Sequence, residues 1–248
     1  MSEKILWRSN TGWHDWRYGA PLYRLLAEAT RLGLIGRANR VEPAKADPAP
    51  LLLAQSGEEL AKAILAMPPT RRDITEILVA GSDPAPWELY WNVYPFDAES
   101  GELDGFNTLW LTFDRSRVSD REASEALREA FMTACSATDT EYAMIHPYNH
   151  WSDFADKYYE VPVTINLQFK GVFWANFLGP GHLNEFDRAK LADLDAHQAR
   201  WVDGNGLFVI ATPDLASADA PDSEGELLRL TQRFRDALRP DSRWSRRR

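Results

Sequence analysis

A chain of 248 residues, 44% of them hydrophobic and 26% charged, has the composition of a globular protein with a large core. No apolar run approaches the roughly 20 residues that span a bilayer, and residues 1–10 lack the apolar segment of a signal peptide, which predicts a cytoplasmic protein. The single cysteine, Cys135, excludes an internal disulfide and agrees with a reducing compartment.

The net charge of -9 is unevenly distributed along the chain. The first fifty residues and the last ten are both basic, so residues 51–238 carry a net charge of -16. A body this acidic repels nucleic acid and attracts basic proteins, which speeds their encounter. The same charge also keeps a protein in solution, so it does not identify a partner by itself.

The N-terminal part of the chain predicts two helices, a loop and a strand. Residues 21–32 have the apolar spacing of a helix, with a proline in the first turn and a glycine after the end. Residues 40–50 are rich in Pro and Ala and predict a loop. Residues 56–66 begin with a capping box and predict a helix, and residues 74–79 predict a short strand.

Alternation of period two begins at the next segment. Residues 87–94 and 107–113 alternate in this way and predict an antiparallel hairpin, joined by the acidic, turn-forming residues 97–105. Ser119 opens a capping box before the most amphipathic helix pattern in the chain. Cys135 lies at the end of this helix, where we expect a small buried residue rather than a nucleophile.

The second half of the chain predicts strands joined by turns, together with short helices. We expect an irregular, aromatic segment over residues 147–162 and a disordered end at residues 243–248. The other predicted elements are strands at 142–145, 163–169 and 171–178, a helix capped by Asn184 and extending to about Leu194, a hairpin at 200–211 and a helix at 227–238.

Strands grouped as hairpins between blocks of helices predict an α+β fold rather than a parallel βαβ series. The expected architecture is a largely antiparallel β-sheet with helices packed mainly on one face. We expect one domain over residues 1–238, followed by a basic, disordered tail at 239–248. No strand leads into a Gly-rich loop and a helix, so the sequence predicts no phosphate-binding cradle.

Two histidines, His146 and His150, are four residues apart, a spacing that on a helix places both on one face as metal ligands. Pro147 argues against a helix there, and Asp153 and Asp156 are merely the nearest further donors. We therefore expect no catalytic set, no metal and no cofactor. A hydrolase that uses a cleft of His146, His150 and Asp153 is the alternative.

Residues 171–180, Gly-Val-Phe-Trp-Ala-Asn-Phe-Leu-Gly-Pro, form an aromatic strand with a Gly-Pro turn, and a hairpin follows at 200–213. Over residues 163–238 this combination resembles the immunity protein 52 family of bacterial polymorphic toxin systems. A similar immunity family is associated with type VI secretion. The resemblance implies a protein that is not an enzyme and that binds and neutralises one cognate toxin, often a nuclease. The residues that carry it are Gly171, Phe173, Trp174, Asn176, Phe177, Gly179 and Pro180.

Strand alternation places the residues of this motif on two faces, of which at least one is expected in the core. The other face is either covered by a helix or available to a partner. The first set is Phe173, Ala175 and Phe177, and the second set is Trp174, Asn176 and Leu178.

The expected partner is a cognate toxin, with neither nucleic acid nor membrane, although an adaptor without a toxin partner stays open. Two irregular segments combine carboxylates, which steer a basic protein, with rigid aromatic residues of the kind that dominate binding hot spots. The candidate interface residues are Asp97, Glu99, Glu102, Asp104, Tyr148, Trp151, Asp153, Asp156 and Glu160.

Overall fold

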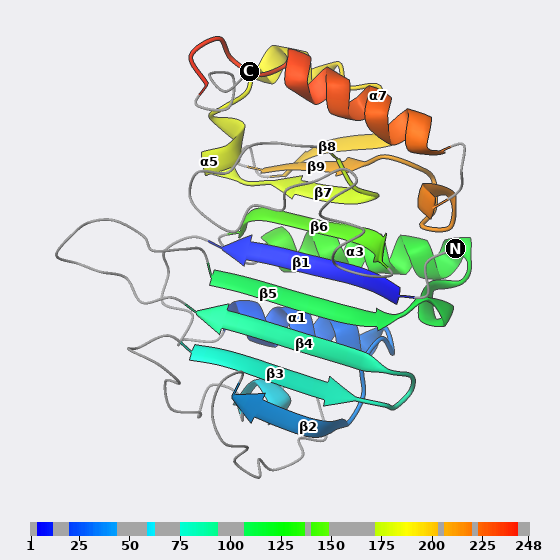
Figure 1. Ribbon diagram of the computed structural model, residues 1–248. Coiled ribbons are helices and arrows are strands. Elements are labelled where there is room, and N and C mark those ends of the chain that lie inside the picture. The colour runs from blue at the N-terminus through cyan, green and yellow to red at the C-terminus, as the bar shows by residue number, and fades with distance from the viewer. Residues whose placement is uncertain are drawn as a thin grey trace, which may run out of the picture.

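A nine-stranded antiparallel sheet organises the protein in the computed structural model (Figure 1). The structure describes residues 4–11, 20–43, 59–62, 75–93, 107–136, 140–148, 172–202, 206–219 and 223–242. Together with its helices, this sheet confirms the predicted α+β class. None of the described helices is long and apolar enough to cross a membrane.

The strand order is β2-β3-β4-β5-β1-β6-β7-β9-β8, and every neighbouring pair is antiparallel. The strand nearest the N-terminus therefore lies in the interior of the sheet, paired with β5 on one side and with β6 on the other. The strands are β1 (Lys4–Thr11), β2 (Ala38–Pro43), β3 (Thr75–Gly81), β4 (Trp87–Val93), β5 (Asn107–Asp114), β6 (Thr140–Tyr148), β7 (Ala175–Leu178), β8 (Gln198–Val202) and β9 (Gly206–Ile210).

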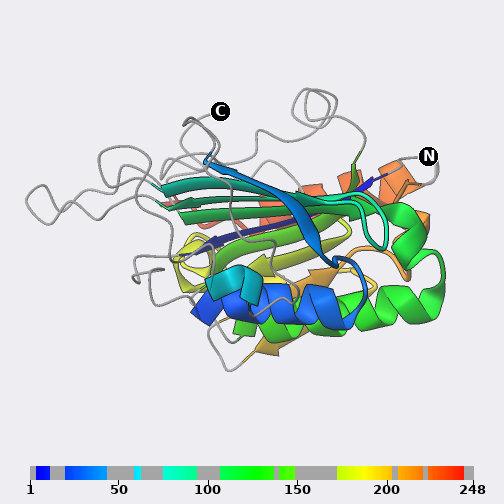
Figure 2. The ribbon, with the colours of Figure 1, turned by 90° about the horizontal axis from the view of Figure 1, so that it is seen from below.

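Helices lie on both faces of the sheet, and Figure 2 shows α1 and α3 beneath one of them. On the opposite face, α7 packs over the part of the sheet that β6, β7 and β9 form. The helices are α1 (Ala20–Arg31), α3 (Arg121–Ser136), α5 (Pro180–Leu183), α6 (Arg188–Ala192) and α7 (Ser223–Asp236), with 3-10 turns η2 (Arg115–Val118) and η3 (Ser217–Asp219).

Period-two alternation divides the buried side chains of the sheet between two clusters, one on each face. On β1, Ile5 and Trp7 face α1 and α3, whereas Leu6 faces the α7 side. On β9, Phe208 and Ile210 join the first cluster, and their neighbours along the strand join the second. Both faces of these strands are therefore apolar, as expected for strands covered on both sides.

Three aromatic rings connect the central strand, the longest described helix and β9 inside the first cluster. Trp7 meets Phe131 of α3 edge-on, with ring centroids 5.6 Å apart, and Phe131 lies 5.6 Å from Phe208. All three side chains are almost completely buried. Burial of such large rings and their mutual contacts stabilise the docking of α3 on the sheet.

Several predicted boundaries are wrong. β2 extends to Pro43, into the loop expected over residues 40–50, and β6 extends through Pro147, inside the segment predicted as irregular. Pro147 lacks an N–H donor, but β7 pairs with β6 only as far as Ile145, so no β6–β7 hydrogen bond is lost there. Residues 163–169 lie outside the described residues, and of residues 56–66 only 59–62 are described, as a helical turn.

The helix caps also differ from the predicted ones. Asp120, not Ser119, accepts a hydrogen bond from the backbone N–H of Ala123 at the start of α3. Asn184 ends α5, and the side chain of Asp187 caps α6 by accepting from Ala189. The expected helix from Asn184 to about Leu194 is therefore two short helices with a turn between them.

The first residues of the predicted tail make contacts with the rest of the chain. Arg239 donates its backbone N–H to the carbonyl oxygen of Glu185, and the hydroxyl of Ser242 donates to the Glu185 carboxylate at 2.8 Å. Residues 239–242 thus pack against the turn between α5 and α6. Residues 243–248 lie outside the described residues.

We predict that Phe131→Ala lowers the free energy of unfolding by about 3–5 kcal/mol, because it leaves a cavity between Trp7 and Phe208. Chemical denaturation measures this loss. The matched control, Thr133→Ala, changes an exposed residue of the same helix and should shift the free energy by less than about 0.5 kcal/mol. Equal effects of the two variants would contradict this account of the core.

Candidate functional site

Asn176 holds together the backbone turn that leads into β7. Its side-chain oxygen accepts the backbone N–H of Phe173 at 2.9 Å, and its side-chain nitrogen donates to the Phe173 carbonyl at 2.8 Å. The same nitrogen lies 3.4 Å from the carbonyl oxygen of Val209 on β9. Because Asn176 is only 2% exposed, these bonds satisfy a buried amide that would otherwise be costly.

Trp174 and His146 complete this turn. The backbone N–H of Trp174 donates to Nδ1 of His146 at 3.2 Å, and its indole N–H donates to the Thr212 carbonyl at 3.2 Å. A ring that accepts at Nδ1 carries its proton on Nε2 when neutral. His146 also meets the Phe173 ring edge-on, with centroids 5.5 Å apart. His146 therefore has a structural role in joining β6 to the turn.

The predicted division of the motif between two faces is only partly right. Ala175 and Phe177 share the cluster on the α3 side, but Trp174 joins them and Phe173 lies in the opposite cluster. The reason is that the strand begins at Ala175, after a bend, so strict alternation does not extend to Phe173 and Trp174. Residues 172–179 are all buried, so Pro180 is the only exposed residue of the motif among those that the structure describes.

The Gly-Pro turn after β7 is pressed against β6. The N–H of Gly179 donates to the Glu141 carbonyl at 2.9 Å, and a Cβ at Gly179 would overlap the carbonyl oxygen of Thr140. Pro180 occupies the first turn of α5, where its missing N–H is not required. These close contacts give a structural reason for glycine followed by proline.

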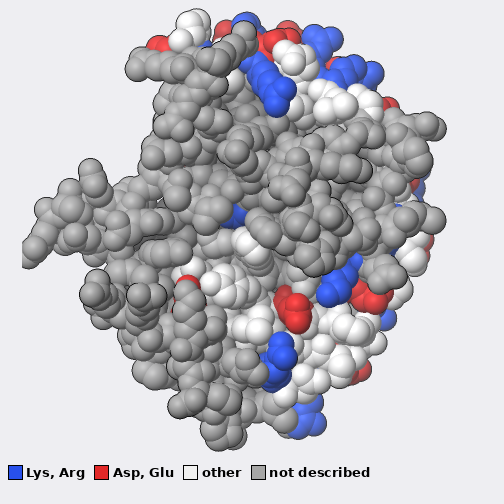
Figure 3. All heavy atoms as spheres, in the orientation of Figure 1, with Lys and Arg blue, Asp and Glu red and all other residues white. Residues whose placement is uncertain are grey.

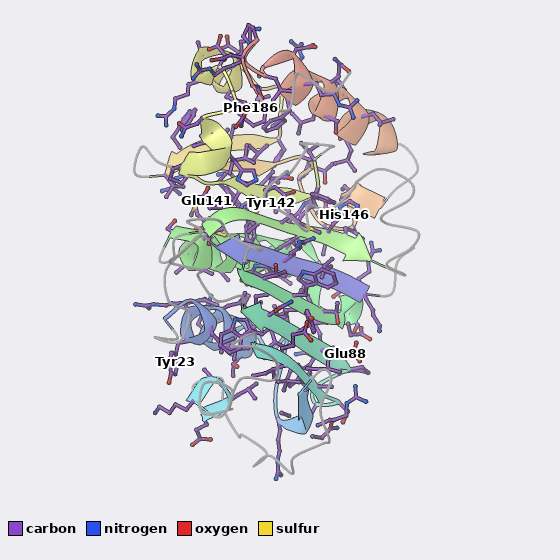
Figure 4. All side chains as sticks on the ribbon, turned by 60° about the vertical axis from the view of Figure 1, so that its left-hand side comes forward. Tyr23, Glu88, Glu141, Tyr142, His146 and Phe186 are labelled. Atoms are coloured by element: carbon purple, nitrogen blue, oxygen red, sulfur yellow. The ribbon has the colours of Figure 1, made fainter. Side chains whose placement is uncertain are left out.

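The carboxylate of Glu141 on β6, labelled in Figure 4, lies near the imidazole of His182 on α5. Oε2 of Glu141 accepts the N–H of Gly181 at 2.9 Å and lies 3.8 Å from Nδ1 of His182, which stacks on the Tyr142 ring. Partial burial raises the pKa of Glu141, but the hydrogen bond and charge of His182 and the backbone N–H groups outweigh it. The net effect holds the pKa of Glu141 below its usual value.

Arg8 of β1 is a buried cation. Its side chain lies on the same face of the sheet as α7, which covers only part of that face. Its side chain is 1% exposed, and its guanidinium carbon lies 5.1 Å from the centre of the Trp110 ring. Burial lowers the pKa of Arg8 to about 9, with the nearby Tyr142 acting in the opposite direction. Arg8 still carries its charge at neutral pH, and the face of the indole is attractive for that charge.

Cys135 is buried, as expected, and burial raises the pKa of its thiol well above the usual value, although a hydrogen bond with Thr140 opposes this. Within the described ranges, no group of three or more His, Cys, Asp or Glu residues could hold a metal ion. Of the proposed hydrolase cleft, only His146 is described; His150 and Asp153 lie outside the described residues.

The segments predicted to bind a toxin leave the sheet at opposite ends. Asn107, which follows the first segment, pairs with Thr11, whereas Tyr148, which precedes the second, pairs with Lys4. These two residues of β1 are about 20–25 Å apart. Tyr148 ends β6, but its side chain is not described, and the other candidates lie outside the described residues: Asp97, Glu99, Glu102, Asp104, Trp151, Asp153, Asp156 and Glu160, together with the motif residue Gly171.

Charge on the described surface is mixed rather than uniformly acidic. Figure 3 shows Lys and Arg side chains gathered, with acidic ones among them, at the end of the molecule where α7 lies. A shallow hollow of about 410 Å³ at this end is rimmed by Arg188, Lys190 and Arg239. Each of these cations has a neighbour: Trp201, the Asp236 carbonyl and Asp241, respectively.

Sequence reasoning missed both Arg8 and the pair of Glu141 and His182. Arg8 follows the apolar run Ile5-Leu6-Trp7 and precedes the polar Ser9, and no local pattern there distinguishes a buried arginine from an exposed one. Glu141 and His182 belong to different elements and meet only through the Gly-Pro turn. The signal that could have pointed to this pair is the run of glycine and proline before His182, because glycine permits a close approach to a neighbouring strand.

Comparison with known proteins shows a related fold but no family. The sequence matches no protein-family profile and no curated protein at a significant level. Among solved structures, the fold is similar to that of the Pseudomonas aeruginosa T6SS protein PA0821, with a TM-score of 0.60 over 94% of this chain and 74% of that chain. The two sequences are 16% identical, so the likeness concerns the fold alone.

We predict that Asn176→Ala lowers the free energy of unfolding by about 2 kcal/mol or more, because the N–H and carbonyl of Phe173 lose their buried partner. Asn176→Asp should also destabilise, since a carboxylate cannot donate to the Phe173 carbonyl. Denaturation curves measure both effects. The exposed Asn184→Ala serves as the control and should change stability little; a comparable loss there would mean that the bonds of Asn176 are unimportant.

Glu141 should make stability depend on pH. Its native pKa lies below the usual value of 4.5, so its ionised form favours the folded state above that value. This contribution is lost as the pH falls through the lowered native pKa. We expect Glu141→Gln to be less stable than the parent at pH 7, with the difference shrinking below about pH 4. Thermal melting across pH 3–7 tests this, and a difference that is constant with pH would contradict it.

Proposed function

We propose that this protein is a non-enzymatic immunity protein of a bacterial secretion system, binding one cognate toxin stoichiometrically and neutralising it. The observation that carries the proposal is the fold, which is similar over 94% of the chain to a protein described as a T6SS protein. The resemblance of residues 171–180 and of the hairpin after them to immunity proteins supports the same role. A nuclease toxin fits the acidic charge of residues 51–238, because nucleases are basic where they hold DNA.

The buried motif restricts where such a toxin would bind. Trp174 and Asn176 are 0% and 2% exposed and use their polar groups within the fold. The toxin therefore contacts other parts of the chain. The acidic residues between β4 and β5, and those after β6, remain the proposed contacts, with Tyr148 and Trp151 as anchors.

The first segment precedes Asn107, which pairs with one end of β1, and the second follows Tyr148, which pairs with the other end. We therefore expect the two segments to contribute separately to binding. Carboxylates at the rim of an interface act mainly on the rate of association, through long-range attraction that salt screens. A buried aromatic anchor acts mainly on the rate of dissociation. Kinetic measurements therefore assign each segment its own effect.

The test uses the toxin encoded beside this gene, with its catalytic residue inactivated, in a surface-binding assay at low salt. The parent should form a one-to-one complex, and co-expression with the active toxin should restore growth. Neutralising Asp97, Glu99, Glu102 and Asp104 to the amides should slow association roughly tenfold. Trp151→Ala should speed dissociation, at a cost of about 2 kcal/mol or more in binding free energy.

A charge-matched control separates the proposed surface from net charge. The amide variant of Glu122, Glu129, Asp193 and Glu226 removes the same charge from exposed positions elsewhere. It should bind nearly as fast as the parent; equal slowing by both quadruple variants would reject the first segment as a contact. Loss of melting temperature in Trp151→Ala without faster dissociation would show that this ring only packs the fold. No binding at all would favour an adaptor role.

A further inference from the structure

The strand at one end of the sheet has a neighbour on one side only, as far as the described residues go. Among the described strands, β8 pairs only with β9, and it lies at the upper end of the sheet in Figure 1. Every residue of β9 is buried, whereas Ala199 and Arg200 of β8 are exposed and its other residues are half-buried. An open edge presents backbone N–H and carbonyl groups to which a further strand can bind.

The two end strands of the sheet differ in how they are protected. The register of β2 against β3 is irregular between Ala38 and Arg40, and β2 ends at Pro43. Bulges and prolines are the usual means by which natural sheets prevent edge pairing. The register of β8 against β9 is regular over all of Gln198–Val202, and that strand contains no proline. Of the two edges, β8 is the one suited to accept a strand.

The side chains of β8 specify what can lie beside it. Arg200 is paired with Phe208, so it points to the face of the sheet that α3 covers. Trp201 points to the opposite face, where it packs against the second cluster. The guanidinium carbon of Arg188 lies over its ring, 5.5 Å from the ring centre. A strand added beside β8 would place one residue opposite Arg200. A neighbouring residue of that strand would lie next to the apolar ring of Trp201.

A second copy of this chain is a poor occupant of the edge. Antiparallel pairing of two β8 strands centred on the middle residue would place Arg200 directly opposite the same arginine of the second copy. Like charges directly opposite each other destabilise a strand pair, and opposite charges stabilise it. Arg200 thus acts against self-association through this edge and in favour of a carboxylate.

We propose that β8 is an interaction surface that binds an extended segment of a different protein by antiparallel strand addition. That segment carries Asp or Glu opposite Arg200 and an apolar residue beside Trp201. Main-chain hydrogen bonds supply the affinity, and the two side-chain positions supply the selectivity. This surface is independent of the identity of the toxin and of the acidic segments proposed above.

The chain itself supplies a defined probe, the Arg200→Glu variant. When mixed with the parent, it places a carboxylate opposite Arg200 in the centred pairing. We expect NMR titration of the labelled parent with unlabelled variant, at concentrations on the order of 1 mM, to shift amide resonances of residues 198–202. The affinity should exceed that of the parent for itself by roughly tenfold, from the reversal of one cross-strand charge pair.

The matched control is Arg233→Glu, which makes the same change in net charge at an exposed position on α7. It should leave residues 198–202 unshifted. Long-range attraction cannot produce the expected result, because both variants are more acidic than a parent whose net charge is already -9. Three outcomes would overturn the proposal: no shifts with Arg200→Glu, equal shifts with Arg233→Glu, or self-association of the parent through β8. Circular dichroism of each variant confirms that it is folded.

Discussion

The two-sided pairing of β1 is the interaction on which the rest of the structure depends. Lys4–Thr11 bonds along its whole length to β5 and to β6, and so joins β2–β5 to β6–β9 in one sheet. The paired residues of both partners lie at least 96 positions away in sequence, so the entropy of closing long loops must be overcome before these bonds form. The sheet can reach its final order only when the N-terminal segment is in place.

Once β1 is in place, the two faces of the sheet follow from alternation along each strand. Trp7 directs its ring toward α3, while Leu6 and Arg8 point to the other side. The turn held by Asn176 is then joined to β9 by the side-chain N–H that Asn176 donates to the Val209 carbonyl, and to β6 by the backbone N–H that Trp174 donates to His146. The described part of the motif that resembles an immunity family is therefore largely structural, since residues 172–179 are buried.

Alternation along the strands explains why one hairpin was predicted and the strand nearest the N-terminus was not. β4 and β5 alternate between buried and partly exposed residues, and their hairpin is confirmed. β1 was missed as a strand because Ile5, Leu6 and Trp7 are all buried, which erases the alternation on which the prediction depends. In the candidate site, burial of the motif was predicted in part, whereas the contact of Glu141 with His182 needs a tertiary approach that no local pattern encodes.

The buried Cys135 has a practical consequence for work on this protein. A thiol with a raised pKa and no solvent access holds almost no thiolate at neutral pH, and the thiolate is the reactive form. Maleimide dyes, spin labels and thiol cross-linkers will therefore not react with the native Cys135 side chain. Any cysteine placed on the surface becomes a unique chemical handle, and distances or proximity can be measured without first removing a native cysteine.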